Sequence, residues 1–320
     1  MAEVGCAGIL VEDTFCGPMA VLPPEGALLA LEEMPTKAGG CAANVAIDLA
    51  KQGVSVDVLG CVGVDSAADF LLQTYQAHGV GHSQVIQLQG HHTSQCIILL
   101  VKDQDRRYLF TAGANQALKA EHISRDWIRQ LKVFYLGGLF VLPGLEPDEL
   151  AELLGFCRSS GVKTVVDVVV PHGLRGMHSL QRLLPLIDVF VPNEDEACAF
   201  TGFTDPSDQL RAFEAAGAQT VFITRGAEGC VAAHQGKRWQ CGAYHMNVVD
   251  PSGSGDAFTS GVIRSLLRGT GVPETMRYAS AVGASATRAP GTTDTVFSAQ
   301  EAEVFVNTHP LSVRETTPWM

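Results

Sequence analysis

The stretch Asp250-Pro251-Ser252-Gly253-Ser254-Gly255-Asp256-Ala257-Phe258 places three small residues directly before an acid. An apolar pattern of helical period follows the acid and stops at Gly269. The small residues are therefore predicted to begin a helix, where several backbone N–H groups lack partners within the helix. These groups and the positive end of the helix dipole attract anions, and the small side chains leave room for a phosphate.

Asp256 would lie beside an anion bound at this helix start. An acid in that position can take a proton from a hydroxyl that then attacks a phosphate, so Asp256 is a candidate general base. A glycine-rich turn that ends in a helix-capping acid explains the same residues, and for this motif alone it is the stronger interpretation. The remainder of the chain has to decide between the two.

The composition allows a sizeable buried core. The chain has 320 residues, 46% of them hydrophobic and 18% charged, which is enough for one large α/β domain or two small ones. A net charge of −12 without a basic block argues against nucleic acid or an anionic membrane as a partner. Nine scattered cysteines, no secretion signal and no apolar stretch long enough to cross a bilayer predict a cytoplasmic protein.

Short apolar runs alternate with helical patterns through the centre and the C-terminal half of the chain. This alternation predicts a doubly wound α/β fold with a mainly parallel sheet that is covered on both faces. Ligands of such sheets bind beyond the carboxyl ends of the strands. The predicted strands are Lys132–Leu136, Lys163–Val170, Ile187–Val191 and Thr220–Thr224, and the predicted helices are Pro147–Arg158, Leu174–Leu184, Glu194–Thr201 and Pro206–Ala216.

Two segments nearer the N-terminus lack this alternation. Val11–Pro35 is rich in proline, glycine and apolar residues, and Val85–Thr111 has β-like runs. They form either a small β-sheet that covers a substrate like a lid or edge strands of the main sheet, and the two readings have nearly equal weight. In the first case the lid comprises residues 12–36 and 85–111, and the core comprises residues 1–11, 37–84 and 112–320.

A second glycine-containing motif, Gly39-Gly40-Cys41-Ala42-Ala43-Asn44-Val45-Ala46, begins a predicted helix that ends near Gln52. Gly39 and Gly40 would expose backbone N–H groups to a polar ligand. The Asn44 amide, one turn later, can both donate and accept hydrogen bonds. For this motif alone, an ordinary strand-to-helix turn is the stronger interpretation.

Two further motifs follow directly after predicted strands. In Pro192-Asn193-Glu194-Asp195-Glu196, the side chains of Asn193 and Glu196 are candidates to hold water around Mg²⁺, but their spacing is also that of a helix capping box. In Thr224-Arg225-Gly226-Ala227-Glu228-Gly229, the glycines allow close approach of a flat ring or a phosphate, but a plain hairpin turn explains them as well.

Together and in this order, the motifs resemble those of the ribokinase-like (PfkB-type) carbohydrate kinase family. The resemblance extends from Asp13 to Gly291, and its N-terminal signature continues into Leu59-Gly60-Cys61-Val62-Gly63-Val64-Asp65. It implies an αβα core with a small β lid. It also implies ATP- and Mg²⁺-dependent transfer of a phosphate to a hydroxyl of a small sugar.

The resemblance implies a role for individual residues. Asp256 would be the general base, and Gly253, Ser254 and Gly255 would form the anion hole. The other implied roles are substrate binding by Asp13, Gly39, Gly40 and Asn44, nucleotide binding by Asn193, Thr224, Gly226 and Gly229, organisation of Mg²⁺ through water by Asn193 and Glu196, and, as in some members, binding of a monovalent cation such as K⁺ by Asp250 and Ser252.

The chain departs from the family pattern in places. Cys41 stands where ribokinases usually carry lysine, so ribose is not favoured as the substrate. Arg106, Arg107 and Lys37 are near enough to the motifs to reach a substrate phosphate. We interpret the two arginines instead as solvated charges in a turn of the lid, and Lys37 as a loop charge.

Other functions are open to the same fold. A nucleoside kinase would need an aromatic acceptor pocket, and the lid segments offer only Phe15, Tyr108 and Phe110. A sensor without catalytic activity would have no use for Asp256. A dinucleotide-dependent dehydrogenase is disfavoured because no GxGxxG follows the first strand. The apolar run Ile97–Val101 suggests that two copies of the chain pair through their lids.

Overall fold

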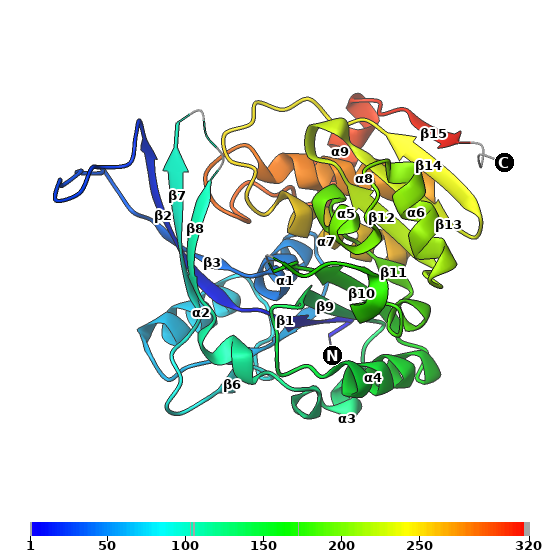
Figure 1. The fold of residues 1–320 in the computed structure, drawn as a ribbon, viewed down its shortest axis with the longest axis horizontal. Coiled ribbons are helices and arrows are strands. Elements are labelled where there is room, and N and C mark those ends of the chain that lie inside the picture. Colours follow the sequence, from blue (N-terminus) through cyan, green and yellow to red (C-terminus); the bar gives the residue numbers. More distant parts are fainter. Residues whose placement is uncertain (1, 103, 105, 172, 317–320) are drawn as a thin grey trace.

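The computed structural model of the protein describes residues 2–102, 104, 106–171 and 173–316. Within these residues the largest sheet has nine strands in the order β15-β14-β13-β12-β11-β10-β9-β1-β4 (Figure 1). Neighbours from β12 to β4 are parallel, and the remaining strands are antiparallel. The bounds are β1 Val4–Gly8, β4 Val56–Leu59, β9 Val133–Leu139, β10 Lys163–Val168, β11 Val189–Phe190, β12 Thr220–Thr224, β13 Cys230–His234, β14 Lys237–Cys241 and β15 Val313–Thr316.

Apolar residues alternate between the two faces of the central strands. In β9, Phe134 and Leu136 belong to one buried cluster, whereas Val133 and Tyr135 belong to the other. The same alternation divides the buried residues of β10, β11 and β12. Because side chains on a strand point to opposite faces in turn, each face of this sheet needs a helical cover.

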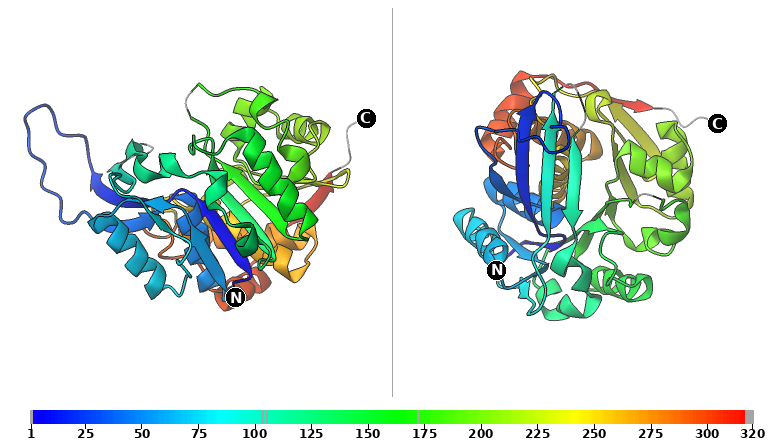
Figure 2. Two further views of the ribbon diagram at one scale, coloured as in Figure 1. Left: turned by 90° about the horizontal axis from the view of Figure 1, so that it is seen from below. Right: turned by 60° about the vertical axis from the view of Figure 1, so that its left-hand side comes forward.

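Helices supply that cover on both faces, so the predicted doubly wound αβα fold is confirmed (Figure 2). One face carries α3 Arg125–Ile128, α4 Pro147–Ser159, α5 Glu194–Thr201 and α6 Pro206–Ala215. The other face carries α1 Cys41–Lys51, α2 Ser66–Ala77, α7 Ser254–Arg268 and α8 Val272–Ala286. No helix within the described residues is both long and apolar enough to cross a membrane.

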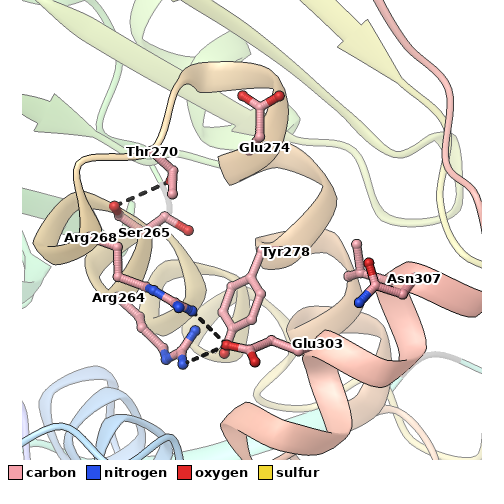
Figure 3. Close-up of a pocket in the computed structure, with 9 residues that line it drawn as sticks. Arg264, Ser265, Arg268, Thr270, Glu274, Tyr278, Glu303 and Asn307 are labelled. Atoms are coloured by element: carbon pink, nitrogen blue, oxygen red, sulfur yellow. Dashed lines mark hydrogen bonds and ion pairs between the residues drawn. The ribbon is translucent and has the colours of Figure 1, made fainter.

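A last helix, α9 Ala299–Thr308, packs outside α7 and α8. Glu303 of α9 accepts hydrogen bonds from Arg264 at 3.0 Å and from Arg268 at 2.5 Å, both on α7 (Figure 3). The guanidinium of Arg264 also lies 4.9 Å from the centre of the Tyr278 ring on α8. These contacts fix the far end of α7, whose first turn contains Asp256.

The lid segments form a sheet of their own, which stands to the side of the main sheet (Figures 1 and 2). Its order is β3-β2-β7-β8, so the interpretation of these segments as edge strands of the main sheet is wrong. β3 begins at Thr36, and the boundary expected at residue 37 therefore falls inside this strand. The bounds are β2 Val11–Met19, β3 Thr36–Gly39, β7 Gln95–Val101 and β8 Arg107–Thr111, and a separate two-stranded sheet pairs β5 Cys61–Val62 with β6 Ile86–Gln87.

One predicted helix is wrong. Leu174–Leu184 forms no α-helix but two short 3₁₀ turns, Met177–Ser179 and Leu184–Leu186. The backbone N–H of Gly176 donates to the carbonyl of Ala199 on α5, and Pro185 has no N–H to continue a helix. The apolar pattern of this segment still holds, because Leu180, Leu183 and Leu184 are buried under the sheet.

Core packing on the α6 face should contribute strongly to stability. Phe213 is fully buried, and its ring lies 5.3 Å from that of Phe190 on β11. Phe213→Ala should therefore lower the free energy of unfolding by about 3–5 kcal/mol, measured by urea denaturation. Phe203→Ala is the matched control, because the Phe203 side chain is 48% exposed. Similar losses in the two variants would contradict the assigned role of Phe213 in the core.

Candidate active site

The first turn of α7 is shaped by a close contact between two loops. Gly253 caps the helix with a φ of 74°, and a Cβ at this position would lie 2.1 Å from the carbonyl oxygen of Thr292. Only glycine fits both the conformation and the contact. The space beside Gly255, by contrast, is open. The leading N–H groups of α7 thus adjoin an open region, where an anion could approach them.

Asp256 points from this turn toward the start of α1. The Nδ2 of Asn44 donates a hydrogen bond of 2.7 Å to the Oδ2 of Asp256. The two helices are held together deeper in the core, where the Gln52 amide donates to the Ser260 hydroxyl at 2.8 Å and accepts from the Tyr278 hydroxyl at 3.0 Å. Among the residues that the structure describes, none forms an ion pair with Asp256, and a neutral amide orients its carboxylate.

Asp13 reaches the same place from the lid sheet. It lies on β2 opposite β3, and it is 7% exposed. A Cβ on Gly39 of β3 would lie 1.8 Å from the Oδ2 of Asp13, so the absence of a side chain at Gly39 makes room for this carboxylate. Gly40 then leads directly into α1, where Asn44 is buried. The four residues predicted to bind a substrate thus gather where the lid meets the core.

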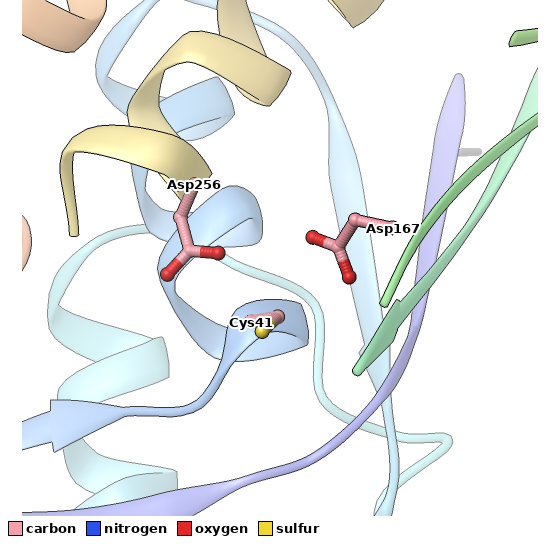
Figure 4. Close-up of side chains that lie close together, drawn as sticks. All are labelled: Cys41, Asp167 and Asp256. Carbon is pink, nitrogen blue, oxygen red and sulfur yellow. The ribbon is translucent and has the colours of Figure 1, made fainter. Parts of the chain in front are cut away.

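Sequence reasoning missed two residues of the site, Asp167 and Tyr135. Asp167 lies near the carboxyl end of β10 and accepts hydrogen bonds from the Tyr135 hydroxyl and, at 2.7 Å, from the backbone N–H of Gly138. Its carboxylate converges with the Cys41 thiol and the carboxylate of Asp256 (Figure 4). The sulfur of Cys41 and one oxygen of each carboxylate lie within 4.8 Å of one another. A single acid inside the apolar run 163–170 was the available signal, since buried acids are rare unless they are paired or functional.

Burial and mutual repulsion act on the acids of this site. Burial, and then the charge of Asp256, raises the pKa of Asp13 to about 7. The same two causes raise the pKa of Asp167 well above its usual range. Burial also raises the pKa of Asp256, but hydrogen bonds from Asn44 and Cys41 oppose the shift. Two neighbouring acids do not both ionise readily. The helix N-terminus favours the ionised form of Asp256, which is half-buried.

A cavity of about 490 Å³ opens on the other side of the same helix start. Its lining includes Thr224, Gly226 and Gly229 of the predicted nucleotide loop together with Ser254 and Gly255 of the predicted anion hole. The loop, with its 3₁₀ turn Gly226–Glu228, is also the hairpin connection between β12 and β13. Its glycines thus turn the chain and line a cavity large enough for a small-molecule ligand.

Asn193 and Glu196 form the capping box that their spacing suggested. The backbone N–H of Glu196 donates to the Asn193 side chain at 2.9 Å, and the backbone N–H of Asn193 donates to the Glu196 carboxylate at 2.8 Å. Asn193 is also bridged to Thr224, so the motif adjoins the nucleotide loop. Burial, and to a smaller extent the charge of Asp256, raises the pKa of Glu196 to about 7.

The interpretation of two basic residues as solvated or loop charges is wrong. Arg106, in the turn before β8, lies with its Nη1 3.7 Å from the Oδ1 of Asp250, and its side chain is 24% exposed. Lys37 lies on β3 and donates to the Oδ2 of Asp294 at 2.6 Å. Asp250 is 2% exposed and accepts hydrogen bonds from the backbone N–H and the hydroxyl of Ser252.

Comparison with known proteins identifies the chain. Residues 11–298 match the model of the pfkB family carbohydrate kinases. The chain belongs to this family. It is therefore a kinase that transfers phosphate to a hydroxyl group of a sugar or a nucleoside.

Similar proteins cover nearly the whole kinase. The ribokinase of Haemophilus influenzae is 27% identical over 84% of this chain and 87% of its own length. The adenosine kinase of Schizophyllum commune is 27% identical over 78% of this chain and 80% of its own length. A solved structure of a putative ribokinase II from Escherichia coli, in complex with ATP and Mg²⁺, has a TM-score of 0.82 at 19% identity and covers 97% of this chain and 100% of its own.

The raised pKa of Asp13 predicts how the stability of the kinase depends on pH. Between the ordinary pKa of 3.8 and the folded value of about 7, the folded protein holds more protons than the unfolded chain. The free energy of unfolding should therefore fall as the pH rises through this range, by up to about 4 kcal/mol from this group. Asp13→Asn should be more stable than wild type at pH 8, and this advantage should vanish near pH 4.

Thermal denaturation of both proteins across this pH range measures the effect. Asp148→Asn is the control, because Asp148 is an exposed aspartate on α4. An Asp13→Asn variant that is less stable than wild type at pH 8 would contradict the prediction, because it would show that the buried carboxylate is favourable as an ion.

Proposed function

We propose that the protein phosphorylates a hydroxyl of a small, uncharged sugar with ATP and Mg²⁺. The observation that carries this proposal is the position of the first turn of α7. On one side it lines the cavity bounded by the glycine loop, and on the other its Asp256 faces Asn44, with Asp13 close by. A nucleotide and an alcohol bound on the two sides would meet at the leading N–H groups of the helix.

The proposed reaction follows from that geometry. The acceptor hydroxyl gives its proton to Asp256 while its oxygen bonds to the γ-phosphorus of ATP. The bond between this phosphorus and the bridging oxygen of ADP breaks, and ADP leaves. The backbone N–H groups at Gly253, Ser254, Gly255 and Asp256 would stabilise the charge on the transferring group. Asn44 would hold the carboxylate of Asp256 in place for the proton transfer.

The residues beside the nucleotide loop suit Mg²⁺. Glu196 is a partly buried carboxylate with a pKa raised by burial and, less, by the negative charge of Asp256, so a nearby cation would be favourable. Mg²⁺ prefers carboxylate oxygens and keeps several of its waters. Glu196 and Asn193 would hold those waters, and the ion would offset the negative charge of the phosphates. The E. coli neighbour bound to ATP and Mg²⁺ supports the use of these two ligands by the protein.

The charge of the site favours an uncharged acceptor. Asp13, Asp167, Glu196 and Asp256 lie near enough to one another for the charge of Asp256 to raise the pKa of the other three. Lys37, a positively charged residue nearby on β3, is already paired with Asp294. An acceptor that already carries a phosphate or a carboxylate would add negative charge to this region and be repelled. A nucleoside is the alternative acceptor, supported by the adenosine kinase relative.

We also propose that the kinase acts in the cytoplasm as a homodimer. Its scattered cysteines suit a reducing compartment. The outer part of the lid exposes Ile97, Tyr108, Leu109 and Phe110, each at 41–59%. Apolar side chains on the strands of a small open sheet are typical of a surface that a second copy covers.

Disruption of this surface tests the dimer. Leu109→Asp, at a side chain that is 59% exposed, should yield monomers in sedimentation experiments at micromolar concentration, while the wild type sediments as a dimer. Val304→Asp, at a side chain 57% exposed on α9, is the control and should remain dimeric. A monomeric wild type would contradict the proposal.

The function itself is tested by the release of ADP with Mg²⁺ and a panel of acceptors: pentoses, hexoses, sugar phosphates, sugar acids and nucleosides. One or more uncharged sugars should be phosphorylated, and the anionic ones should not. Asp256→Asn should lower kcat by roughly 10²–10⁴-fold with little change in ATP affinity, because only proton transfer is lost. Asp69→Asn, at an exposed acid in the first turn of α2, is the control. Near-normal turnover by Asp256→Asn would refute its role as the base.

A further inference from the structure

Arg106, which directly precedes β8 in the lid, reaches the loop that precedes α7. Its Nη1 is 3.7 Å from the Oδ1 of Asp250. Asp250 is almost fully buried, and three-quarters of the Arg106 side chain is shielded from solvent. The Nε of Arg106 donates to the hydroxyl of Tyr108 on β8, which braces the guanidinium against the lid. A shielded ion pair of this kind is screened much less by salt than one on the surface.

Asp250 organises the two loops that build the anion hole. Its Oδ1 accepts from the backbone N–H of Ser252 at 2.9 Å and from the Ser252 hydroxyl at 2.7 Å. Its Oδ2 accepts from the backbone N–H of Gly291 at 3.3 Å. The neighbouring Thr292 packs against Gly253, the residue that caps α7. The carboxylate of Asp250 thus holds the 250–253 loop against the 291–292 loop.

A buried carboxylate in this role needs a positive charge beside it. The family resemblance predicted a monovalent cation bound by Asp250 and Ser252. The residues do not fit that expectation, because the guanidinium of Arg106 already stands 3.7 Å from the carboxylate oxygen that accepts from the Ser252 hydroxyl. The charge that a bound K⁺ would supply is present on a side chain of the lid.

We propose that Arg106 is a positioning residue that replaces the monovalent cation at Asp250 and thereby links the lid to the anion hole. The kinase then needs no K⁺. Because Arg106 belongs to the lid, its charge arrives at Asp250 only when the lid lies over the core. The anion hole therefore gains its full order together with closure over the acceptor, which limits transfer of phosphate to water. This inference rests on the proposed kinase function.

The first test compares kcat in K⁺ with kcat in choline at constant ionic strength. The wild type should be insensitive to the exchange. Arg106→Ala should lose about ten- to hundredfold in kcat without K⁺, as expected when the charge that faces a buried carboxylate is removed. K⁺ should restore much of this loss, whereas Arg106→Lys, which keeps the charge, should stay insensitive. Arg107→Ala is the matched control, because the exposed Arg107 bonds to Gln104 of the same turn.

The second test needs no turnover. K⁺ should raise the melting temperature of nucleotide-free Arg106→Ala and leave those of the wild type and Arg107→Ala unchanged. If no acceptor in the panel is phosphorylated, the proposed function fails. The melting temperatures still decide whether Arg106 replaces the cation, because they do not depend on turnover. Activation of the wild type by K⁺, or an Arg106→Ala variant that behaves like Arg107→Ala, would overturn the inference. The inference would also be overturned if Arg106→Ala lost activity but K⁺ neither restored this activity nor raised the melting temperature of the variant.

Discussion

The contact between Asn44 and Asp256 is the interaction on which the site depends. It requires that α1 and α7, far apart in the sequence, begin at the same edge of the sheet and lie side by side. The hydrogen bonds of Gln52 to Ser260 and Tyr278 fix that packing one and two turns below the site. In the proposed reaction, the base is thus a carboxylate held by a neutral partner. An arginine or lysine in place of Asn44 would orient the carboxylate equally well but would make it a weaker base.

Several residues serve the backbone and the ligand sites together. The glycines between β12 and β13 make a hairpin turn and also line the cavity proposed for the nucleotide. Asn193 and Glu196 cap α5 and lie next to that cavity through the bridge to Thr224. For such motifs the structural and the functional interpretation are not competitors. A side chain that is already fixed by a cap or a turn loses little further freedom when a ligand binds.

Much of the fold and part of the site could be predicted from the sequence, because the signals are local. The strand-and-helix alternation and the small residues before Asp256 are each read within a few positions. Asp167 stood out locally only as a single acid in an apolar run. Its partners and the partner of Arg106 could not be predicted, since these contacts join segments distant in the chain. The helix predicted over residues 174–184 was wrong for a related reason. Its leucines have helical spacing, but they are buried by successive short turns that are anchored to α5. Whether the lid was a separate sheet also depended on pairing, which composition does not specify.

Asp13 belongs to the lid sheet, whereas Asp256 belongs to the core. When both carboxylates are ionised they repel each other, and this repulsion acts between the lid sheet and the core. An acceptor alcohol that hydrogen-bonds to both carboxylates would lessen this repulsion as it binds. Burial and the charge of Asp256 raise the pKa of Asp13 to about 7. Protonation of Asp13 in mild acid therefore removes the repulsion between lid and core, and ionisation in alkali restores it.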